Sequence, residues 1–228
     1  MSEVWDTLIK IQDHLIGKFV GTGIEIHEPG MDRFNQPGWL NRVWTSDTYR
    51  RAHIDVVDAR DTKGLWMMHC CVFPHLTNNG PIFGLDVIAG RNKITGFFHD
   101  FSPTTDSIHP MIEGFADNVA TLEWRKPREL PEWARAIFTQ SMVAAGNVNS
   151  TEELEQLVDL SFNSIDAYLE EIGNFNKTTT HEKGKETQNR YASYQKQNPH
   201  TPRTMVSLGL SDEDVKLFVE ECLFPDIE

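Results

Sequence analysis

The stretch Pro81-Ile82-Phe83-Gly84-Leu85-Asp86-Val87-Ile88-Ala89-Gly90 reads as a β-strand with one carboxylate at its centre. Burying a charged group in such an apolar run is costly unless a partner or a ligand takes up the charge. Side chains alternate between the two faces of a strand, so Gly84 and Asp86 share a face. The missing side chain at Gly84 leaves room beside Asp86 for a flat ligand or a close backbone approach. The stretch therefore predicts a sheet with Asp86 as a functional residue.

Two preceding stretches also place titratable groups among apolar residues. Ala52–Asp58 carries His53 and Asp55 on one face, and Leu65–Phe73 carries His69. If the faces of the three strands coincide, the floor of a pocket carries His53, Asp55, His69 and Asp86. Such a cluster indicates proton transfer to a bound apolar molecule.

Each of these residues also has a purely structural interpretation. A half-buried histidine such as His69 often only satisfies hydrogen bonds in a core. Asp55 could face solvent, and Asp86 could pair with a structural arginine. His53 and His69 with a carboxylate would also suit a metal site of two histidines and one carboxylate. The strand pattern permits that site without requiring it, and our leading interpretation contains no metal.

Motifs for bound cofactors are missing from the sequence. The chain has no Gly-x-Gly-x-x-Gly after a strand, no Gly-x-x-x-x-Gly-Lys and no Gly-x-Ser-x-Gly. We therefore expect no bound cofactor, and chemistry that relies on acid–base residues and on the electronics of the ligand.

The first half of the chain reads as strands after a short helix. Residues from Trp5 to Leu15 have helical spacing, and Gly17 is expected to end that helix. Short connections rich in Gly, Pro and Asn separate the strands and favour antiparallel neighbours. The predicted strands are Phe19–His27, Trp39–Thr45, Ala52–Asp58, Leu65–Phe73, Phe83–Ala89 and Lys93–Phe101.

The second half reads as helices. Pro131 opens one helix, and the capping-box pattern Ser150-Thr151-Glu152-Glu153 opens a longer one. Asn174–Lys185 is polar and predicted as a loop, followed by a helix through Tyr191 and a last helix after Ser211. Strands followed by helices indicate the α+β class, with helices covering an antiparallel sheet. A chain of 228 residues fits one domain spanning residues 1–228.

Composition limits the classes of partner and the compartment. The net charge of −13 argues against nucleic acid and anionic membranes as partners. No apolar run approaches the length of a membrane span, and the first residues lack the charged and apolar regions of a signal peptide. Three cysteines form no disulfide framework and fit a reducing compartment. These features predict a cytoplasmic protein.

Four ordered segments of the sequence form a recognisable set: Tyr49–Asp55, Met68–Pro74, Pro81–Gly90 and Asp100–Thr104. They resemble the ferredoxin-dependent bilin reductases, and the branch of phycocyanobilin:ferredoxin oxidoreductases in particular. The resemblance implies a three-layer α/β/α sandwich that holds biliverdin IXα between the sheet and the C-terminal helices. It also implies that ferredoxin supplies single electrons, that the bilin passes through radical states, and that side chains supply protons.

The resemblance assigns roles to individual residues. Asp86 matches the family's central aspartate, which hydrogen-bonds the pyrrole nitrogens and donates a proton. His69 matches the histidine that binds a lactam oxygen, and His53 matches a histidine in the hydrogen-bond network beneath the site. Asn198 falls where several members carry a second aspartate. Its amide can orient a lactam or a water molecule but cannot act as an acid.

Asp55 departs from the family pattern. The phycocyanobilin-forming enzymes carry glutamate there, which is implicated in reducing the exovinyl group of the D ring. Aspartate sets its carboxyl about 1.5 Å further back, and proton transfer needs heavy atoms within about 3 Å. We therefore expect phycoerythrobilin, formed through 15,16-dihydrobiliverdin, as the product. A phycocyanobilin-forming enzyme, an enzyme that stops at dihydrobiliverdin and a non-catalytic bilin carrier are the alternatives.

Ferredoxin, the implied partner, would have to bind a particular kind of surface on this chain. Plant-type ferredoxins are acidic, so docking on this acidic chain requires a local positive surface. The run Arg125-Lys126-Pro127-Arg128 could provide it, and so could cations nearer the C-terminus. We expect the protein to act as a monomer. The C-terminal cations are Lys183, Lys185, Arg190, Lys196 and Arg203.

Overall fold

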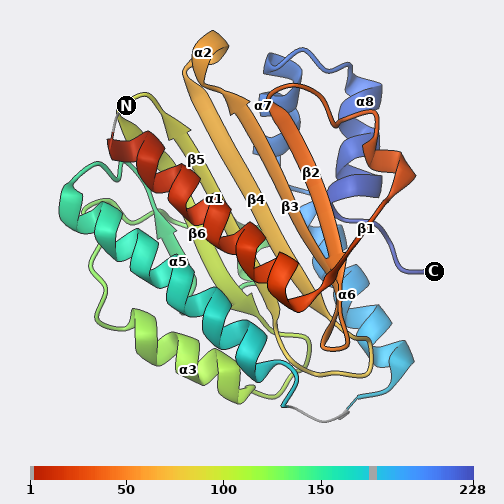
Figure 1. Ribbon diagram of the computed structural model, residues 1–228. Coiled ribbons are helices and arrows are strands. Elements are labelled where there is room, and N and C mark those ends of the chain that lie inside the picture. Colours follow the sequence, from red (N-terminus) through yellow and green to blue (C-terminus); the bar gives the residue numbers. More distant parts are fainter. Residues whose placement is uncertain (1–2, 175–178) are drawn as a thin grey trace.

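A computed structural model describes residues 3–174 and 179–228. Within these residues, seven strands form one antiparallel sheet whose spatial order follows the chain (Figure 1). Each strand pairs with the next strand along the chain, so short hairpins make most of the connections. The strands are β1 (Ile24–Ile26), β2 (Trp39–Thr45), β3 (Tyr49–Ala59), β4 (Leu65–Pro74), β5 (Ile82–Gly90), β6 (Lys93–Ser102) and β7 (Val143–Ala145).

Helices cover both faces of the sheet, which confirms the three-layer α/β/α sandwich (Figure 1). One face is covered by α1 (Glu3–Thr22), α3 (Pro110–Val119) and α5 (Thr151–Glu171). The other face is covered by α6 (His181–Gln195), α7 (His200–Ser207), α8 (Asp212–Leu217) and the π-helical turn η2 (Phe218–Leu223). Three short helical segments are η1 (Pro29–Met31), α2 (Arg60–Lys63) and α4 (Glu132–Arg135). None of the described helices is both long and apolar enough to cross a bilayer.

Alternation along the strands separates two cores of different character. On β4, Trp66 and Met68 pack into the core beneath α1 and α5, whereas Met67 and Phe73 join the core beneath α6 and η2. The side of β5 that faces α1 and α5 is entirely apolar. Apart from Asp58, the polar residues of β3, β4 and β5 therefore gather on the side of α6, α7 and η2.

The predicted start of the chain is wrong in two respects. The first helix continues through Gly17 to Thr22, and only Ile24–Ile26 of the predicted strand Phe19–His27 is extended. Phe19 is fully buried and continues the stripe of α1 that packs on the sheet. Gly17 lies on the exposed side, where its weak helix propensity does not outweigh this packing.

The predicted loop Asn174–Lys185 is also partly wrong. Residues 175–178 lie outside the described part of the chain, but α6 begins at His181, with the Thr180 hydroxyl accepting a hydrogen bond from Lys183 N. Because the first turn of α6 is polar, the sequence pattern did not indicate a helix there. The packing of this helix relies on Gly184, which lies against the backbone of Leu76. Further along, α4 follows Pro131 and α5 follows its Ser150 cap as predicted.

Candidate active site

Three neighbouring strands bring Asp55, His69 and Asp86 into one line. In the antiparallel register Asp55 of β3 lies opposite His69 of β4, and His69 lies opposite Asp86 of β5. Directly opposed residues of a sheet point to the same face. The structure thus places a row of three proton-active side chains on the face covered by α6, α7 and η2.

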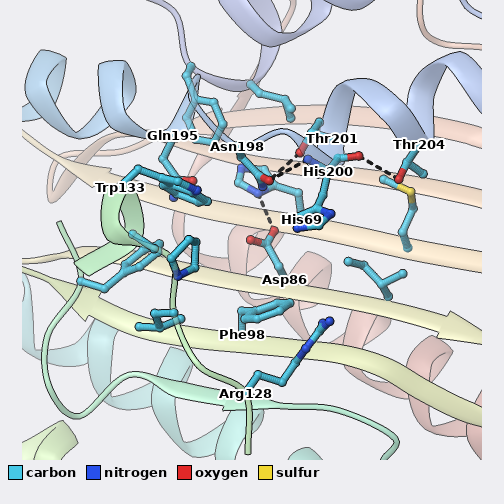
Figure 2. Close-up of a pocket in the computed structure, with 18 of the residues that line it drawn as sticks. His69, Asp86, Phe98, Arg128, Trp133, Gln195, Asn198, His200, Thr201 and Thr204 are labelled. Atoms are coloured by element: carbon cyan, nitrogen blue, oxygen red, sulfur yellow. Dashed lines mark hydrogen bonds and ion pairs between the residues drawn. The ribbon is translucent and has the colours of Figure 1, made fainter. Parts of the chain in front are cut away.

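Asp86 and His69 form a hydrogen-bonded pair. His69 Nδ1 lies 2.7 Å from Asp86 Oδ1, and the carboxylate is 39% exposed whereas the imidazole is 12% exposed (Figure 2). The Asp86 carboxylate, which lies in an apolar strand, therefore contacts His69 on one side and faces the open cavity on the other. His69 Nε2 is buried and has no hydrogen-bond partner within the described residues. The pair can share one proton and pass it to a molecule in front of Asp86.

Asp55 is the buried acid of the row. Its side chain is 1% exposed, and Trp39 Nε1 donates a hydrogen bond of 2.5 Å to its Oδ1. Burial raises the pKa of the Asp55 carboxyl to about 7, although the bond from Trp39 opposes the rise. A carboxyl with this pKa holds a proton near neutral pH and can still give it up, as a general acid must.

His53 lies one step along β3 from this row, in register with Cys71 of β4. It is fully buried, and its Nε2 lies 3.2 Å from Asn41 Oδ1, the oxygen that accepts its N–H. Burial lowers the pKa of the imidazole well below its usual 6.5, so His53 is neutral. Its ring lies 6.1 Å from the ring of His69 but does not line the cavity in front of Asp86. His53 thus lies beside the row, on the same face of the sheet.

Gly84 is in register with Cys71 and does not line the cavity either. A Cβ atom at Gly84 would lie 3.3 Å from the hydroxyl of Tyr191 on α6, so this tyrosine fills the room that the glycine leaves. The Tyr191 hydroxyl also accepts a 2.8 Å hydrogen bond from Gln195 Nε2. The glycine therefore serves the close approach of α6 to the sheet in this structure.

A cavity of about 320 Å³ lies over the row, between the sheet and the segments α4, α6, α7 and η2. Its volume falls within the range of small-molecule sites, and its walls are largely apolar with a few polar groups, as such sites are. The lining includes Asp55, His69, Asp86 and Asn198, together with Met67, Ile88, Phe98, Leu130, Trp133, Phe138, Met142, Met205, Leu223 and Phe224.

Asn198 lies in the link between α6 and α7. Its Oδ1 accepts a 3.0 Å hydrogen bond from His200 N, and its Nδ2 lies 3.4 Å from Thr201 Oγ1 (Figure 2). The side chain therefore fixes the first turn of α7 while it lines the cavity. An amide has further donor capacity beyond these bonds, which remains available to a ligand.

Several lining residues were not found by the sequence analysis. Phe98 lies opposite Asp86 on β6 and extends the row, which the alternation of Lys93–Phe101 could have indicated. Arg128, grouped in the sequence with a surface run, lies over the Phe98 ring, with its Cζ 5.5 Å from the ring centroid (Figure 2). It is the only lysine or arginine among the described lining residues. An anionic group of a ligand would therefore face Arg128.

The described residues contain no group of three His, Cys, Asp or Glu side chains arranged to hold a metal ion. His53 and His69 each use one ring nitrogen for an intramolecular hydrogen bond, to Asn41 and Asp86 respectively.

Sequence comparison places the chain among reductases. The family model described as "Ferredoxin-dependent bilin reductase" matches residues 33–225. Phycocyanobilin:ferredoxin oxidoreductase of Synechococcus sp. (strain CC9605) is 32% identical over 120 residues, which are 52% of this chain and 48% of the relative. The enzyme of the same name from Prochlorococcus marinus (strain MIT 9313) is 28% identical over 182 residues, or 78% of this chain and 67% of the relative. The chain thus matches about half of the length of the first relative and two thirds of the second.

Two solved structures share the fold. One, of a protein named PcyX, is 37% identical with a TM-score of 0.73 and covers 97% of this chain and 99% of its own. The other is phytochromobilin synthase from tomato in complex with biliverdin, with 14% identity, a TM-score of 0.75, and coverage of 94% of this chain and 81% of its own. At that identity the tomato structure supports the fold alone.

Proposed function

Because the chain belongs to the family of ferredoxin-dependent bilin reductases, we propose that it reduces biliverdin IXα with electrons from reduced ferredoxin. The observation that carries the proposal is the row of Asp55, His69 and Asp86 on the floor of a largely apolar cavity. A flat conjugated tetrapyrrole suits apolar walls, and its reduction needs proton donors beneath the ring system.

The chemistry divides between the partner and the chain. Reduction of two double bonds takes four electrons, which ferredoxin delivers singly, and four protons, which pass through the site. The Asp86–His69 pair faces the open cavity and gives protons to the bilin after an electron has arrived, and solvent then restores them. Arg128 would face a propionate carboxylate of the bilin. The proposal requires no cofactor bound to the chain.

Asp55 bears on which double bonds are reduced. A carboxyl one methylene shorter than glutamate, with Oδ1 bound to Trp39, is held back on the strand. We propose that it therefore does not serve the exovinyl group, and that the product is phycoerythrobilin, formed through 15,16-dihydrobiliverdin. The names of the Synechococcus and Prochlorococcus relatives favour phycocyanobilin as the second candidate product.

The cysteines and the proposed ferredoxin partner both bear on the compartment in which the protein works. Cys70, Cys71 and Cys222 are free thiols in the structure, which suits a reducing compartment. We propose that the protein works as a monomer in the cytoplasm, where it meets reduced ferredoxin.

The test is an anaerobic assay of the purified protein with biliverdin IXα and reduced ferredoxin, followed by absorption spectra and chromatography. Dihydrobiliverdin that appears and then gives way to phycoerythrobilin is the expected result. Formation of phycocyanobilin would keep the reductase and overturn the proposed product. Tight binding of biliverdin without turnover would instead identify a bilin carrier.

A further inference from the structure

The carboxyl of Asp55 is held by an indole that lies outside the cavity. Asp55 lines the cavity, whereas Trp39 does not, and Trp39 is only 5% exposed. Trp39 begins β2 and lies opposite Val57, one step along the sheet from Asp55. From this diagonal position its Nε1 reaches Asp55 Oδ1 at 2.5 Å. One oxygen of the acid is thus engaged from the side away from any ligand.

The indole is itself fixed by aromatic packing. The Trp39 ring lies 4.9 Å from the ring of Phe218 at 70° and 5.7 Å from the ring of Phe34. Phe34 and Phe218 are also in contact, with centroids 4.9 Å apart. All three side chains are buried, so the donor cannot follow the carboxyl if the carboxyl rotates. The hydrogen bond therefore restrains Asp55 more firmly than a flexible donor would.

We propose that Trp39 is a positioning residue for Asp55: its N–H holds Oδ1, so that Oδ2 is the oxygen that delivers the proton. A neutral carboxyl that accepts at Oδ1 carries its hydrogen on Oδ2. In the transfer, the Oδ2–H bond breaks and the proton joins a bilin carbon that has already received electrons from ferredoxin. The same indole N–H then stabilises the carboxylate until solvent returns a proton. The identity of the acceptor rests on the proposed function, but the positioning of Asp55 does not.

The sign of the pH effect follows from the surroundings of Asp55. Burial, which raises the pKa to about 7, is opposed by the bond from Trp39 and by the His69 imidazole, whereas the nearby Asp86 carboxylate adds to the rise. His53 on the same strand is neutral, and burial raises the pKa of the Cys222 thiol on η2 to about 12. Removing the indole N–H leaves the other influences in place. The pKa of Asp55 must then rise, and the acid must become a weaker proton donor.

The first experiment follows the protonated carboxyl band by infrared spectroscopy as a function of pH, in protein without bilin. Asp55→Asn identifies the band by its loss. In Trp39→Phe the midpoint is expected to move up by about one pH unit or more, because a hydrogen bond to the carboxylate is lost. Trp44→Phe is the matched control, since Trp44 is also buried on β2 but its Nε1 has no partner within the described residues. An equal midpoint in both variants would overturn the proposal.

The second experiment measures anaerobic turnover with reduced ferredoxin. Trp39→Phe should slow at least one of the two bilin reductions about tenfold, with its pH profile displaced upward, and Trp44→Phe should leave both rates unchanged. Equal rates in the two variants would also overturn the proposal. If Trp39→Phe does not fold, 3-benzothienylalanine at position 39 removes the N–H and keeps the shape of the ring. A wild-type protein that reduces no bilin would refute the proposed function, and the infrared titration would still decide the role of Trp39.

Discussion

At the level of single residues, Asp86 both lines the cavity and forms a hydrogen bond with His69. The isosteric change Asp86→Asn keeps the shape of the side chain but removes the acidic proton. We expect turnover to fall by about 100-fold or more while biliverdin still binds. Initial anaerobic rates and an absorption titration with biliverdin measure the two effects. The matched control is Asp58→Asn, which changes an aspartate of β3 that binds Arg60 outside the cavity. An Asp86→Asn enzyme with wild-type rates would remove Asp86 from the mechanism.

Asp55 offers a test of product choice. The change Asp55→Glu adds one methylene, which advances the carboxyl by about 1.5 Å into the cavity. We expect phycocyanobilin to appear among the products, because the longer acid reaches the exovinyl group. Chromatography of the products after complete turnover is the measurement. If the variant makes no phycocyanobilin, residue 55 does not determine the regiochemistry.

The sequence predicted the titratable residues of the site better than the residues that pack around them. Asp55, His69 and Asp86 could be located because strict alternation and short hairpins leave little freedom in the pairing of neighbouring strands. Trp39 reaches Asp55 on a diagonal from β2, and alternation within one strand does not reveal such a contact. Tyr191 comes from α6 to cover Gly84, so only the packing of a distant helix decides what fills that space.

Among the elements, α6 makes a close backbone contact at Gly184 with the connection between β4 and β5. A Cβ atom there would lie 1.9 Å from Leu76 O, which is a backbone atom and cannot swing away. Gly184→Ala should therefore lower the free energy of unfolding by about 2–3 kcal/mol, as overpacking does. Urea denaturation measures the change. Bilin binding should weaken as well, because α6 carries Gln195 into the cavity.

A second helical glycine provides the control for this change. A Cβ atom at Gly114 in α3 would meet nothing within 4 Å. Gly114→Ala should leave the protein unchanged or stabilise it by up to about 1 kcal/mol, because alanine has the higher helix propensity. Equal stability of the Gly184 and Gly114 variants would show that α6 can shift to accommodate a side chain.

The strands were easier to predict than the ends of the helices. Strands β2 to β6 follow from period-two patterns bounded by turn residues. From the sequence we expect α1 to end at Gly17 and the first turn of α6 to be a loop. The reason is that Gly17 and the polar run after Asn174 are local signals of a break. Packing of Phe19 and Gly184 against distant segments outweighs those signals.

Across the whole molecule, the net charge of −13 makes docking of an acidic ferredoxin depend on a few cations. Arg125 lies 3.8 Å from both Glu152 and Glu153, and Arg128 lines the cavity. The run predicted from the sequence thus contributes less open positive charge than its composition suggests. Lys126 and Arg203 are exposed, and within the described residues neither forms an ion pair.

We predict that these two cations help to recruit ferredoxin. The second-order rate constant with reduced ferredoxin should fall about tenfold between low and high salt, because screening weakens the attraction. Lys126→Glu and Arg203→Glu should lower the rate at low salt. Lys10→Glu on α1, which covers the face of the sheet opposite α7 and its Arg203, is the control. Stopped-flow kinetics at several ionic strengths make the measurement, and a rate constant that does not change with salt would rule out electrostatic recruitment.

The order of the strands along the sheet has a consequence for synthesis on the ribosome. Strands β3, β4 and β5 are complete once residue Gly90 has emerged, whereas α6, α7 and η2 follow only from His181 onward. At translation rates of about 5–20 residues per second, the roughly 130 residues from Gly90 to Phe224 take on the order of ten seconds to make. During that interval the nascent chain exposes the face of the sheet that α6, α7 and η2 later cover. This face includes apolar core residues, which chaperones can bind. Under the proposed function, biliverdin can bind only after the chain has been synthesised past Phe224, which lines the cavity.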